Sequence, residues 1–395
     1  MIILALNCGS SSVKYSLYEW YKQRIITKGN IERIGQKGGV RNHHKAIEQI
    51  LSSLIKENFV DNLNQINAVG HRVVHGGDKF HSSVLIDSKV LKIIKSVSSL
   101  APLHNPPNID GIEVVKKILP EIPQVAVFDT AFHYTIPEHA YIYPVPYEWY
   151  QKYGVRRYGF HGSSHLYVSK VAAKMLKKRI ENCNLISLHI GNGVSFTAIK
   201  QGISIDTSMG MTPLEGAVMG TRSGSIDPGI IDFMADKLRI SAKKIVSTLN
   251  TKSGLLGISC KYTDHRNLEQ AIKDGDEKAK LSLEIEVHRI KKYIGSYIAI
   301  IGRVDALIFT AGVGENDSYI RDHVCDGLEH LGIKLDHDLN DCTTCKSGNT
   351  VISKRESKMK IFMIPTNEEA ILVEDVVSIL QGTYDSHMKY SYAFE

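Results

Sequence analysis

The sequence predicts an α/β protein in which one type of domain occurs twice. Segments with apolar residues at helical spacing alternate with short apolar segments that are typical of buried strands. A pattern of strand, glycine turn, strand and strand near the N-terminus returns roughly 180 residues later. The chain of 395 residues is also longer than one compact core usually supports. Together these observations favour two domains of similar topology.

The first copy of this pattern begins at the N-terminus. Residues 2–7, 13–18 and 24–31 are predicted strands, and the turn at 8–12 contains one glycine and three serines. Such a turn presents backbone N–H groups and small hydroxyls, so it can surround phosphate oxygens, and Lys14 adds positive charge beside it. Taken alone, the segment is explained equally well as an ordinary tight turn.

The second copy has the same order of elements. Its turn is Gly191, Asn192 and Gly193, and Gly191 holds the place that Gly9 holds in the first copy. The strands predicted around this turn are 185–189, 195–199 and 202–206. The duplication predicts two hairpin turns that face each other across a cleft.

Further helices and strands complete the predicted domains. Apolar residues at three- and four-residue spacing predict helices at 44–58, 89–101, 109–119, 164–178, 230–239, 268–301 and 317–331. Buried strands are predicted at 68–73, 125–128, 306–310 and 360–364. Residues 143–150 contain two prolines and are the expected hinge between the halves.

Composition excludes several classes of function. Hydrophobic content of 43% and charged content of 23% are ordinary for a globular protein, and no window of 18 apolar residues suggests a membrane span. The net charge of +6 is spread along the chain, which suits small anionic substrates better than nucleic acid. Six irregularly spaced cysteines fit a reducing cytoplasm. Cys342 and Cys345 form one CxxC pair without a partner motif, so a surface loop is favoured over a zinc or redox site.

A third glycine turn follows the predicted strand 306–310. Residues 311–316 contain Gly312 and Gly314 and precede a predicted helix, so they could place backbone amides beneath a nucleotide. The chain contains neither a Walker A motif nor G-x-G-x-x-G, which removes the signatures of P-loop NTPases and Rossmann dehydrogenases. Three glycine turns, each after a strand, indicate phosphate binding.

Four polar residues lie where strands or glycine-rich loops end. Arg72 ends the strand 68–73, and Arg222 lies in a loop flanked by glycines; either could bind a carboxylate or phosphate, although most single arginines form surface ion pairs. Asp129 follows the strand 125–128 and could serve as a base, a magnesium contact or a cap. His161 lies between glycines, which favours an exposed functional imidazole over a structural one.

These motifs together resemble those of the acetokinase family, which belongs to the sugar kinase/Hsp70/actin superfamily. The resemblance runs from end to end of the chain, through residues 7–14, 71–77, 102–108, 128–133, 157–165, 189–195, 212–228, 309–316 and 364–369. It implies two duplicated actin-like, ribonuclease H-like ATPase domains around a central cleft. The expected domains are 1–148 with a C-terminal return at 370–395, and 149–369, the nucleotide-binding domain.

The resemblance also implies an activity, namely reversible transfer of the ATP γ-phosphoryl group to acetate, giving acetyl phosphate and ADP by direct in-line transfer with Mg²⁺ or Mn²⁺. Arg72, Asp129, His161 and Arg222 would be the catalytic residues, with both arginines binding the carboxylate and the transferring phosphoryl group. Asn7 and Glu368 would hold the metal together with Asp129. Such a transfer needs positioning and charge neutralisation more than a covalent nucleophile.

The remaining implied contacts concern the acetate methyl group and the nucleotide. A small apolar pocket would comprise Val74, Leu103, Phe160 and Pro213, and propionate would be a slower substrate. The nucleotide would contact Ser10, Ser12, Lys14, His189, Asn192, Gly193, Asp264, His265, Arg266, Gly312, Val313, Gly314 and Asn316. His265 departs from the family pattern, which has an aromatic residue here, and this leaves the base preference open.

Three other functions are considered. A propionate kinase shares every block above, and a bulky pocket disfavours butyrate. A non-catalytic ATP-binding module of the Hsp70/actin type would give Arg72 and Arg222 no anionic acceptor to bind. A metal-dependent hydrolase has no metal-ligand spacing to support it. The family further suggests a homodimer that closes on its ligands.

Overall fold

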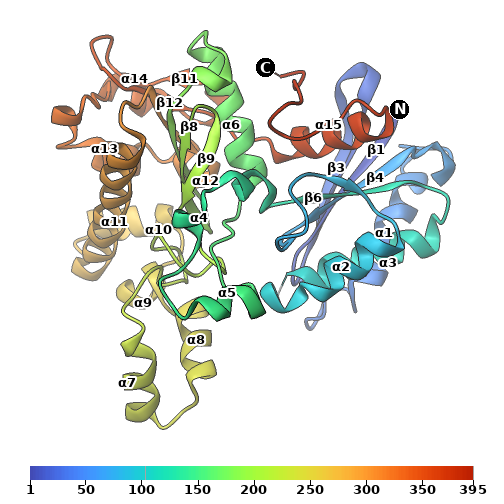
Figure 1. The fold of residues 1–395 in the computed structure, drawn as a ribbon, viewed down its shortest axis with the longest axis horizontal. Coiled ribbons are helices and arrows are strands. Elements are labelled where there is room, and N and C mark those ends of the chain that lie inside the picture. Colours follow the sequence, from blue (N-terminus) through green and yellow to red (C-terminus); the bar gives the residue numbers. More distant parts are fainter. Residues whose placement is uncertain (103, 395) are drawn as a thin grey trace. The chain divides into compact units, whose positions relative to one another are not determined.

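The computed structural model describes residues 1–102 and 104–394. It divides into two compact units, which are described separately here (Figure 1). The N-terminal unit comprises Met1–Tyr134 and Asn367–Glu395, and the C-terminal unit comprises Thr135–Thr366.

The first boundary between the units lies earlier in the chain than the expected 148/149. Local contacts explain why residues 135–148 belong to the C-terminal unit. The Thr135 hydroxyl donates a hydrogen bond of 2.8 Å to the Ser204 carbonyl, and Ile142 forms a β-bridge with Arg156. The second boundary, at 366/367, lies three residues before the expected 369/370.

Strands of the N-terminal unit form a mixed sheet in the order β3-β2-β1-β4-β6-β5, six strands within the described residues. They are β1 (Ile2–Cys8), β2 (Val13–Glu19), β3 (Arg24–Ile31), β4 (Ala68–Val73), β5 (Val84–Leu85) and β6 (Gln124–Phe128). Strands β1, β4 and β6 run parallel, whereas β2, β3 and β5 are antiparallel to their neighbours.

The described part of the C-terminal unit contains a sheet with the same topology, β9-β8-β7-β10-β12-β11. Its strands are β7 (Leu185–Ile190), β8 (Val194–Lys200), β9 (Ile203–Thr207), β10 (Ala306–Thr310), β11 (Thr350–Val351) and β12 (Lys360–Met363). The parallel and antiparallel pairings match those of the first sheet. Both sheets also carry an irregularity at the same place, between Leu17 and Tyr18 and between Ala198 and Ile199. The predicted duplication is confirmed.

The parallel strands determine where functional residues gather. Because the carboxyl ends of parallel strands meet at one edge of a sheet, β1, β4 and β6 bring Asn7, Arg72 and Asp129 to the same edge. In the C-terminal unit, His189 at the end of β7 pairs in register with Thr310 at the end of β10. Each sheet therefore has one edge at which candidate ligand-binding residues lie.

Helices cover both faces of the first sheet (Figure 1). They are α1 (His43–Lys56), α2 (Ser88–Ser96), α3 (Asn105–Ile118) and α15 (Glu368–Leu380). Leu4, Leu6 and Val69 belong to the core shared with α1 and α3. Gly70 faces α15, and a Cβ atom there would clash with Leu372, so glycine permits this helix to approach the sheet.

The C-terminal unit has more helices. They are α4 (Glu138–Tyr141), α5 (Tyr147–Tyr153), α6 (Gly162–Met175), α7 (Gly229–Leu238), α8 (Ala242–Thr251), α9 (Gly254–Ser259), α10 (His265–Lys273), α11 (Glu277–Ile301), α12 (Ala311–Asn316), α13 (Ser318–Cys325) and α14 (His337–Cys342). Helices α7 and α8 form a hairpin that projects from this unit (Figure 1). None of the described helices combines the length and apolar character needed to cross a membrane.

Several expected elements differ from the structure. The helix expected at 268–301 is two helices, because Gly275, with φ of +86°, interrupts it between α10 and α11. The expected turn at 311–316 is itself the helix α12. The expected hinge at 143–150 overlaps α5.

Each sheet packs against a helix that follows the last strand of the other sheet in sequence. Helix α6 comes after β6 but packs on β7 and β10, and α15 comes after β12 but packs on β1 and β4. This exchange explains why residues 367–395 return to the N-terminal unit.

Candidate functional site

The glycine- and serine-rich turn between β1 and β2 has the expected form. The Gly9 N–H donates to the Ser12 carbonyl at 2.8 Å and closes the turn, while the side chains of Ser10 and Lys14 are exposed. His43, the first residue of α1, lies 2.7 Å through Nε2 from the Gly9 carbonyl. This contact was not predicted, because 34 residues separate the two in sequence.

Arg72 and Asp129 pair with each other through two hydrogen bonds. Arg72 Nε donates to Asp129 Oδ1 at 2.8 Å, and Nη2 donates to Oδ2 at 2.6 Å. Glu368 Oε2, on the first turn of α15, lies 3.8 Å from Arg72 Nε. Two carboxylates therefore share one guanidinium, and this places three of the predicted site residues together.

Burial and neighbouring charges shift the pKa values of Arg72 and Asp129 in opposite directions. Burial raises the pKa of Asp129, and the two hydrogen bonds from Arg72 oppose that change. Burial alone would lower the pKa of Arg72, but Asp129 and Glu368 raise it above its usual range. Arg72 therefore stays charged, and its positive charge is directed at the two carboxylates.

Two asparagines near the start of α3 hold the strand ends in place. Asn108 Oδ1 accepts a hydrogen bond from the Val74 N–H at 3.0 Å, and Asn108 Nδ2 donates to the Cys8 carbonyl at 2.7 Å. Asn105 is fully buried and bonds both the N–H and the carbonyl of His75. Pro106 and Pro107 lie in the first turn of the same helix.

His161 lies at the start of α6 in a left-handed conformation, with φ of +57°. Its Nδ1 is 2.8 Å from the Ser195 hydroxyl, which also lies 2.8 Å from His165 Nε2. The imidazole of His161 stacks on His189 with ring centroids 4.1 Å apart. His189 Nδ1 is in turn 2.8 Å from the Ser164 hydroxyl. Polar contacts thus fix both rings, and the two serines were not predicted.

Gly193 lies between His161 and Arg222. A Cβ atom at this position would be 3.3 Å from His161 Cε1 and 3.5 Å from Arg222 Nη1. Two nitrogen-bearing side chains therefore meet beside the backbone of the second hairpin turn. The geometry joins three predicted site residues and favours an anion there.

Arg222 has no carboxylate partner among the described residues. Its Nη1 donates to the Pro213 carbonyl at 3.4 Å and contacts Met219 Sδ at 3.5 Å. Burial lowers the pKa of Arg222, but a guanidinium remains protonated in proteins. The loop that carries it packs on Gly254, whose φ of +63° and contacts with the Met219 and Arg222 carbonyls admit only glycine. An available positive charge is therefore held in a rigid loop.

A cavity of about 570 Å³ opens in the C-terminal unit. Its lining includes the predicted nucleotide contacts Asn192, Asp264, His265, Arg266, Gly312, Val313 and Asn316. Residues that were not predicted also line it, namely Gly191, Gly220, Thr263, Glu269, Asp317 and Ser318. The helix α12 supplies one wall, because it starts directly at the end of β10.

Three predicted nucleotide contacts of the C-terminal unit, His189, Gly193 and Gly314, are not part of the cavity lining. Gly314 is buried, and its carbonyl accepts a hydrogen bond of 3.0 Å from Arg321 Nη1. A turn was expected here, but Gly314 lies in helix α12 and faces Phe309, Leu188 and Ile190. His189 instead stacks on His161.

His265 is a charged residue in the wall of this cavity. Its Nε2 lies 3.2 Å from Glu286 Oε2, and its Nδ1 lies 3.5 Å from Asp317 Oδ2. Burial alone would lower its pKa, but the two carboxylates outweigh burial and raise the pKa to about 10. Asp264, which caps α10, forms an exposed ion pair with Arg266.

The residues predicted for the methyl pocket come from both units. Val74 is half-buried in the N-terminal unit. Phe160 is almost fully buried and Pro213 half-buried in the C-terminal unit. Leu103 lies outside the described residues.

Cys342 and Cys345 are exposed free thiols, as a surface segment predicts. The Cys345 N–H donates to Asn316 Oδ1 at 3.2 Å, so this segment borders the cavity wall. Among the described residues, no group of three or more His, Cys, Asp and Glu side chains is placed to hold a metal ion.

Comparisons with known proteins cover nearly the whole chain. The profile of the acetokinase family matches residues 2–374. The acetate kinases of Geobacter metallireducens and Treponema pallidum are 54% and 46% identical; each alignment spans 100% of this chain, and 98% and 93% of those proteins. The crystal structure of Porphyromonas gingivalis acetate kinase has 44% identity and a TM-score of 0.91, with 96% of this chain and 99% of that chain covered. A propionate kinase from Francisella tularensis subsp. tularensis has 43% identity and a TM-score of 0.89, with coverage of 95% and 98%.

Proposed function

Because this chain belongs to the acetokinase family, we propose that it is an acetate kinase, which transfers the γ-phosphoryl group of ATP to acetate and forms acetyl phosphate and ADP reversibly. One acetate oxygen attacks the γ-phosphorus in line with the departing ADP oxygen. The observation that carries the proposal is the Arg222 guanidinium, which lies beside Gly193 and has no carboxylate partner among the described residues. Such a group is available for an anion.

Phosphoryl transfer depends on positioning and on neutralising charge. In this proposal Arg222 and His161 bind the equatorial oxygens of the transferring group. The backbone of Asn192 and Gly193 contacts the neighbouring phosphates. The contact of His161 with Ser195 and its stacking on His189 support this role, because they hold the imidazole in one orientation.

The N-terminal unit supplies the carboxylate-binding and metal-binding residues in this proposal. Arg72 binds the acetate carboxylate, and Asn7, Asp129 and Glu368 hold Mg²⁺. The donor set fits this ion, because Mg²⁺ prefers carboxylate and amide oxygens. Asp129 and Glu368 already share one positive partner in Arg72. When bound, the metal would neutralise charge on the phosphate oxygens.

The nucleotide occupies the cavity of about 570 Å³ in the C-terminal unit. Asp264, His265 and Arg266 border the adenosine, and Gly312, Val313 and Asn316 lie along it. In the N-terminal unit, Ser10, Ser12 and Lys14 face the phosphates. Exposure of Ser10 and Lys14 on the closed hairpin turn supports this assignment.

The test is a hydroxamate assay, in which hydroxylamine traps the acyl phosphate formed from ATP and a carboxylate. We expect product with acetate and slower turnover with propionate, because one methylene changes binding in an apolar pocket by only about 1–3 kcal/mol. Faster turnover with propionate would identify a propionate kinase. The absence of product with acetate, propionate and butyrate would refute the proposal.

We also infer a homodimer in the cytoplasm. Helix α7 has no buried residue, and Ile230, Phe233 and Leu238 expose apolar side chains on the projecting hairpin. A second copy of this chain would cover that surface. Each of the six cysteines is a free thiol, which fits a reducing compartment. Sedimentation of the wild type and of Phe233→Glu tests the dimer.

A further inference from the structure

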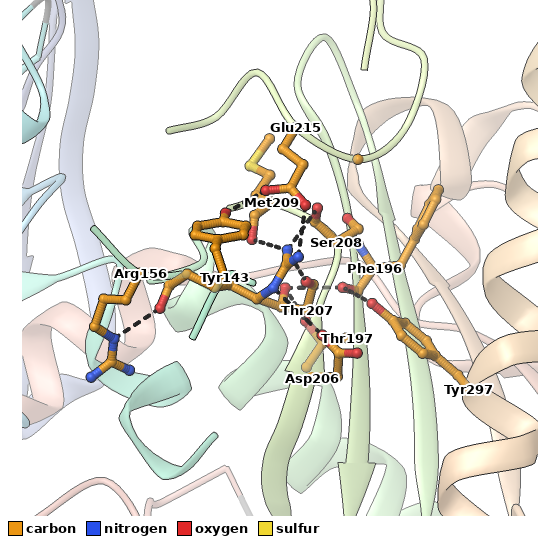
Figure 2. Close-up of polar contacts among 12 residues, drawn as sticks. Tyr143, Arg156, Phe196, Thr197, Asp206, Thr207, Ser208, Met209, Glu215 and Tyr297 are labelled. Carbon is orange, nitrogen blue, oxygen red and sulfur yellow. Dashed lines mark hydrogen bonds and ion pairs between the residues drawn. The ribbon is translucent and has the colours of Figure 1, made fainter. Parts of the chain in front are cut away.

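Arg157 forms a dense set of hydrogen bonds beside β9. Its Nη1 donates to the backbone oxygens of Thr207, Ser208 and Met209, at 2.9, 3.3 and 3.0 Å. Its Nη2 donates to Glu215 Oε1 at 2.7 Å. These acceptor residues, Thr207, Ser208, Met209 and Glu215, lie close together in Figure 2. One side chain thus binds both ends of the loop 208–215.

Tyr143 also binds Glu215 and the same loop (Figure 2). Its hydroxyl donates to Glu215 Oε2 and accepts a hydrogen bond of 2.9 Å from the Met211 N–H. Burial alone would lower the pKa of Arg157, but Glu215, Tyr143 and Asp206 raise it above its usual range. Arg157 is therefore a permanent cation, and the loop is fixed at its middle as well as at both ends.

Hydrogen bonds join the loop 208–215 to the segments that carry two candidate catalytic residues, His161 and Arg222. Arg157 belongs to the short segment that ends at His161, and the N–H groups of Tyr158 and Gly159 both donate to the Gly210 carbonyl. Further along the loop, the Pro213 carbonyl accepts a hydrogen bond from Arg222. The contacts of Arg157 therefore link the segment that carries His161 to the loop that contacts Arg222.

The chemistry of these contacts requires arginine. No helix or strand is assigned to residues 208–216, so their carbonyls need other donors. The planar guanidinium presents donors in a fixed fork and reaches several carbonyls and a carboxylate together. A lysine at 157 would keep the charge but could not hold the same set of acceptors in a fixed geometry.

We propose that Arg157, together with Glu215, is a positioning residue that fixes the Arg222 guanidinium relative to His161 for phosphoryl transfer. The inference rests on the proposed function, because it assigns the transferring phosphoryl group to those two side chains. A shift of the loop would move the Pro213 carbonyl and with it the guanidinium of Arg222. A displacement of about 1 Å can reduce turnover about 100-fold.

The experiment compares Arg157→Ala, Arg157→Lys and Glu215→Gln with the wild type in the hydroxamate assay. We expect kcat to fall about 100-fold for Arg157→Ala and about 10-fold for the other two, while KM for ATP changes less than about 2-fold. Added guanidinium ion at millimolar concentration should restore part of the turnover of Arg157→Ala. A folded Arg157→Ala variant with kcat near that of the wild type would overturn the inference.

A matched control separates positioning from stability. Asp305→Asn weakens an ion pair with Lys178 and a hydrogen bond from the Asn184 N–H in the same unit, away from the loop. It should lower Tm and leave kcat within about 2-fold of the wild type. If Asp305→Asn and Arg157→Lys lower Tm equally and also lower kcat equally, the loss of stability alone explains the fall in kcat, and the inference is overturned. Should Arg157→Ala fail to fold, Arg157→Lys and Glu215→Gln carry the same comparison.

A crystal structure of Arg157→Lys provides a readout that does not depend on activity. The positioning role requires the Pro213 carbonyl and the Arg222 guanidinium to move in this variant, and an unchanged pair would refute it. If the wild type phosphorylates no carboxylate, the proposed function fails, whereas the crystallographic comparison still tests what Arg157 holds.

Discussion

Arg72 and Asp129 form a fork-to-fork pair in which Arg72 Nε and Nη2 each donate to a separate carboxylate oxygen, at 2.8 and 2.6 Å. Asp129 is 2% exposed, so the pair lies largely out of water. Each residue is therefore the main electrostatic partner of the other, in addition to the role proposed for it in the reaction.

Arg72→Met should reduce both stability and turnover. It leaves Asp129 buried without its partner, which costs about 3 kcal/mol in the free energy of unfolding. The double variant Arg72→Met/Asp129→Asn should recover most of that stability without recovering turnover, since in the proposed function both side chains also act on ligands. Urea unfolding and the hydroxamate assay measure the two effects. Recovered activity in the double variant would contradict the proposed roles.

Arg222→Ala should reduce turnover with little effect on stability. No carboxylate among the described residues depends on this guanidinium, so its removal leaves no buried charge unpaired. Loss of a charge that stabilises the transition state lowers kcat at least about 100-fold. Steady-state kinetics with acetate and ATP, together with Tm, check this expectation. Near-normal turnover would exclude the mechanism proposed here.

Gly193→Ala should lower turnover while the fold persists. The added methyl group would lie 3.3 Å from His161 Cε1, so this ring must move by a few tenths of an ångström, whereas its distance of 3.5 Å from Arg222 Nη1 is an ordinary van der Waals contact. We expect a loss in kcat of about 10-fold or more. The matched control is Gly295→Ala in α11, where a Cβ meets nothing within 4 Å. That change should stabilise the protein by about 0.5–1 kcal/mol and leave kcat unchanged.

Because the pKa of His265 is raised in the folded protein, the free energy of unfolding should depend on pH. The folded protein raises its pKa from 6.5 to about 10 through Glu286 and Asp317. The stability from this group is therefore fully present below pH 6.5 and is lost as the pH rises through about 10. His265→Phe should be less stable than the wild type at pH 6, and the difference should shrink toward pH 10. Urea unfolding across this range measures it, and a difference independent of pH would contradict the assignment.

Much of the secondary structure could be predicted from local patterns. The strands 24–31, 68–73 and 306–310 occur with the predicted bounds, because each is a short apolar or alternating segment between turn residues. Gly9 and Gly191 do follow the first strand of each copy. The helix α12 was missed, because its two glycines are typical of a turn, although tertiary contacts such as the one from Arg321 to Gly314 hold it.

The predicted site residues were found by type and by position in the chain. Arg72, Asp129 and Glu368 do meet, as do His161, Gly193 and Arg222. What each of them contacts could not be predicted, since the partners are far apart in sequence. The Arg157 contacts with residues 207–215 are an example, because they span 50 residues or more.

The sequence by itself determined the duplicated α/β architecture, the position of the glycine turns after the first strands and the family, because these depend on local periodicity and on ordered motifs. Only the tertiary structure decided that Arg72 is paired with Asp129 while Arg222 is left available for an anion. From the sequence, the same ligands were predicted for both arginines. Their difference arises from long-range packing, which brings a carboxylate to one guanidinium and, among the described residues, a backbone carbonyl and a thioether to the other.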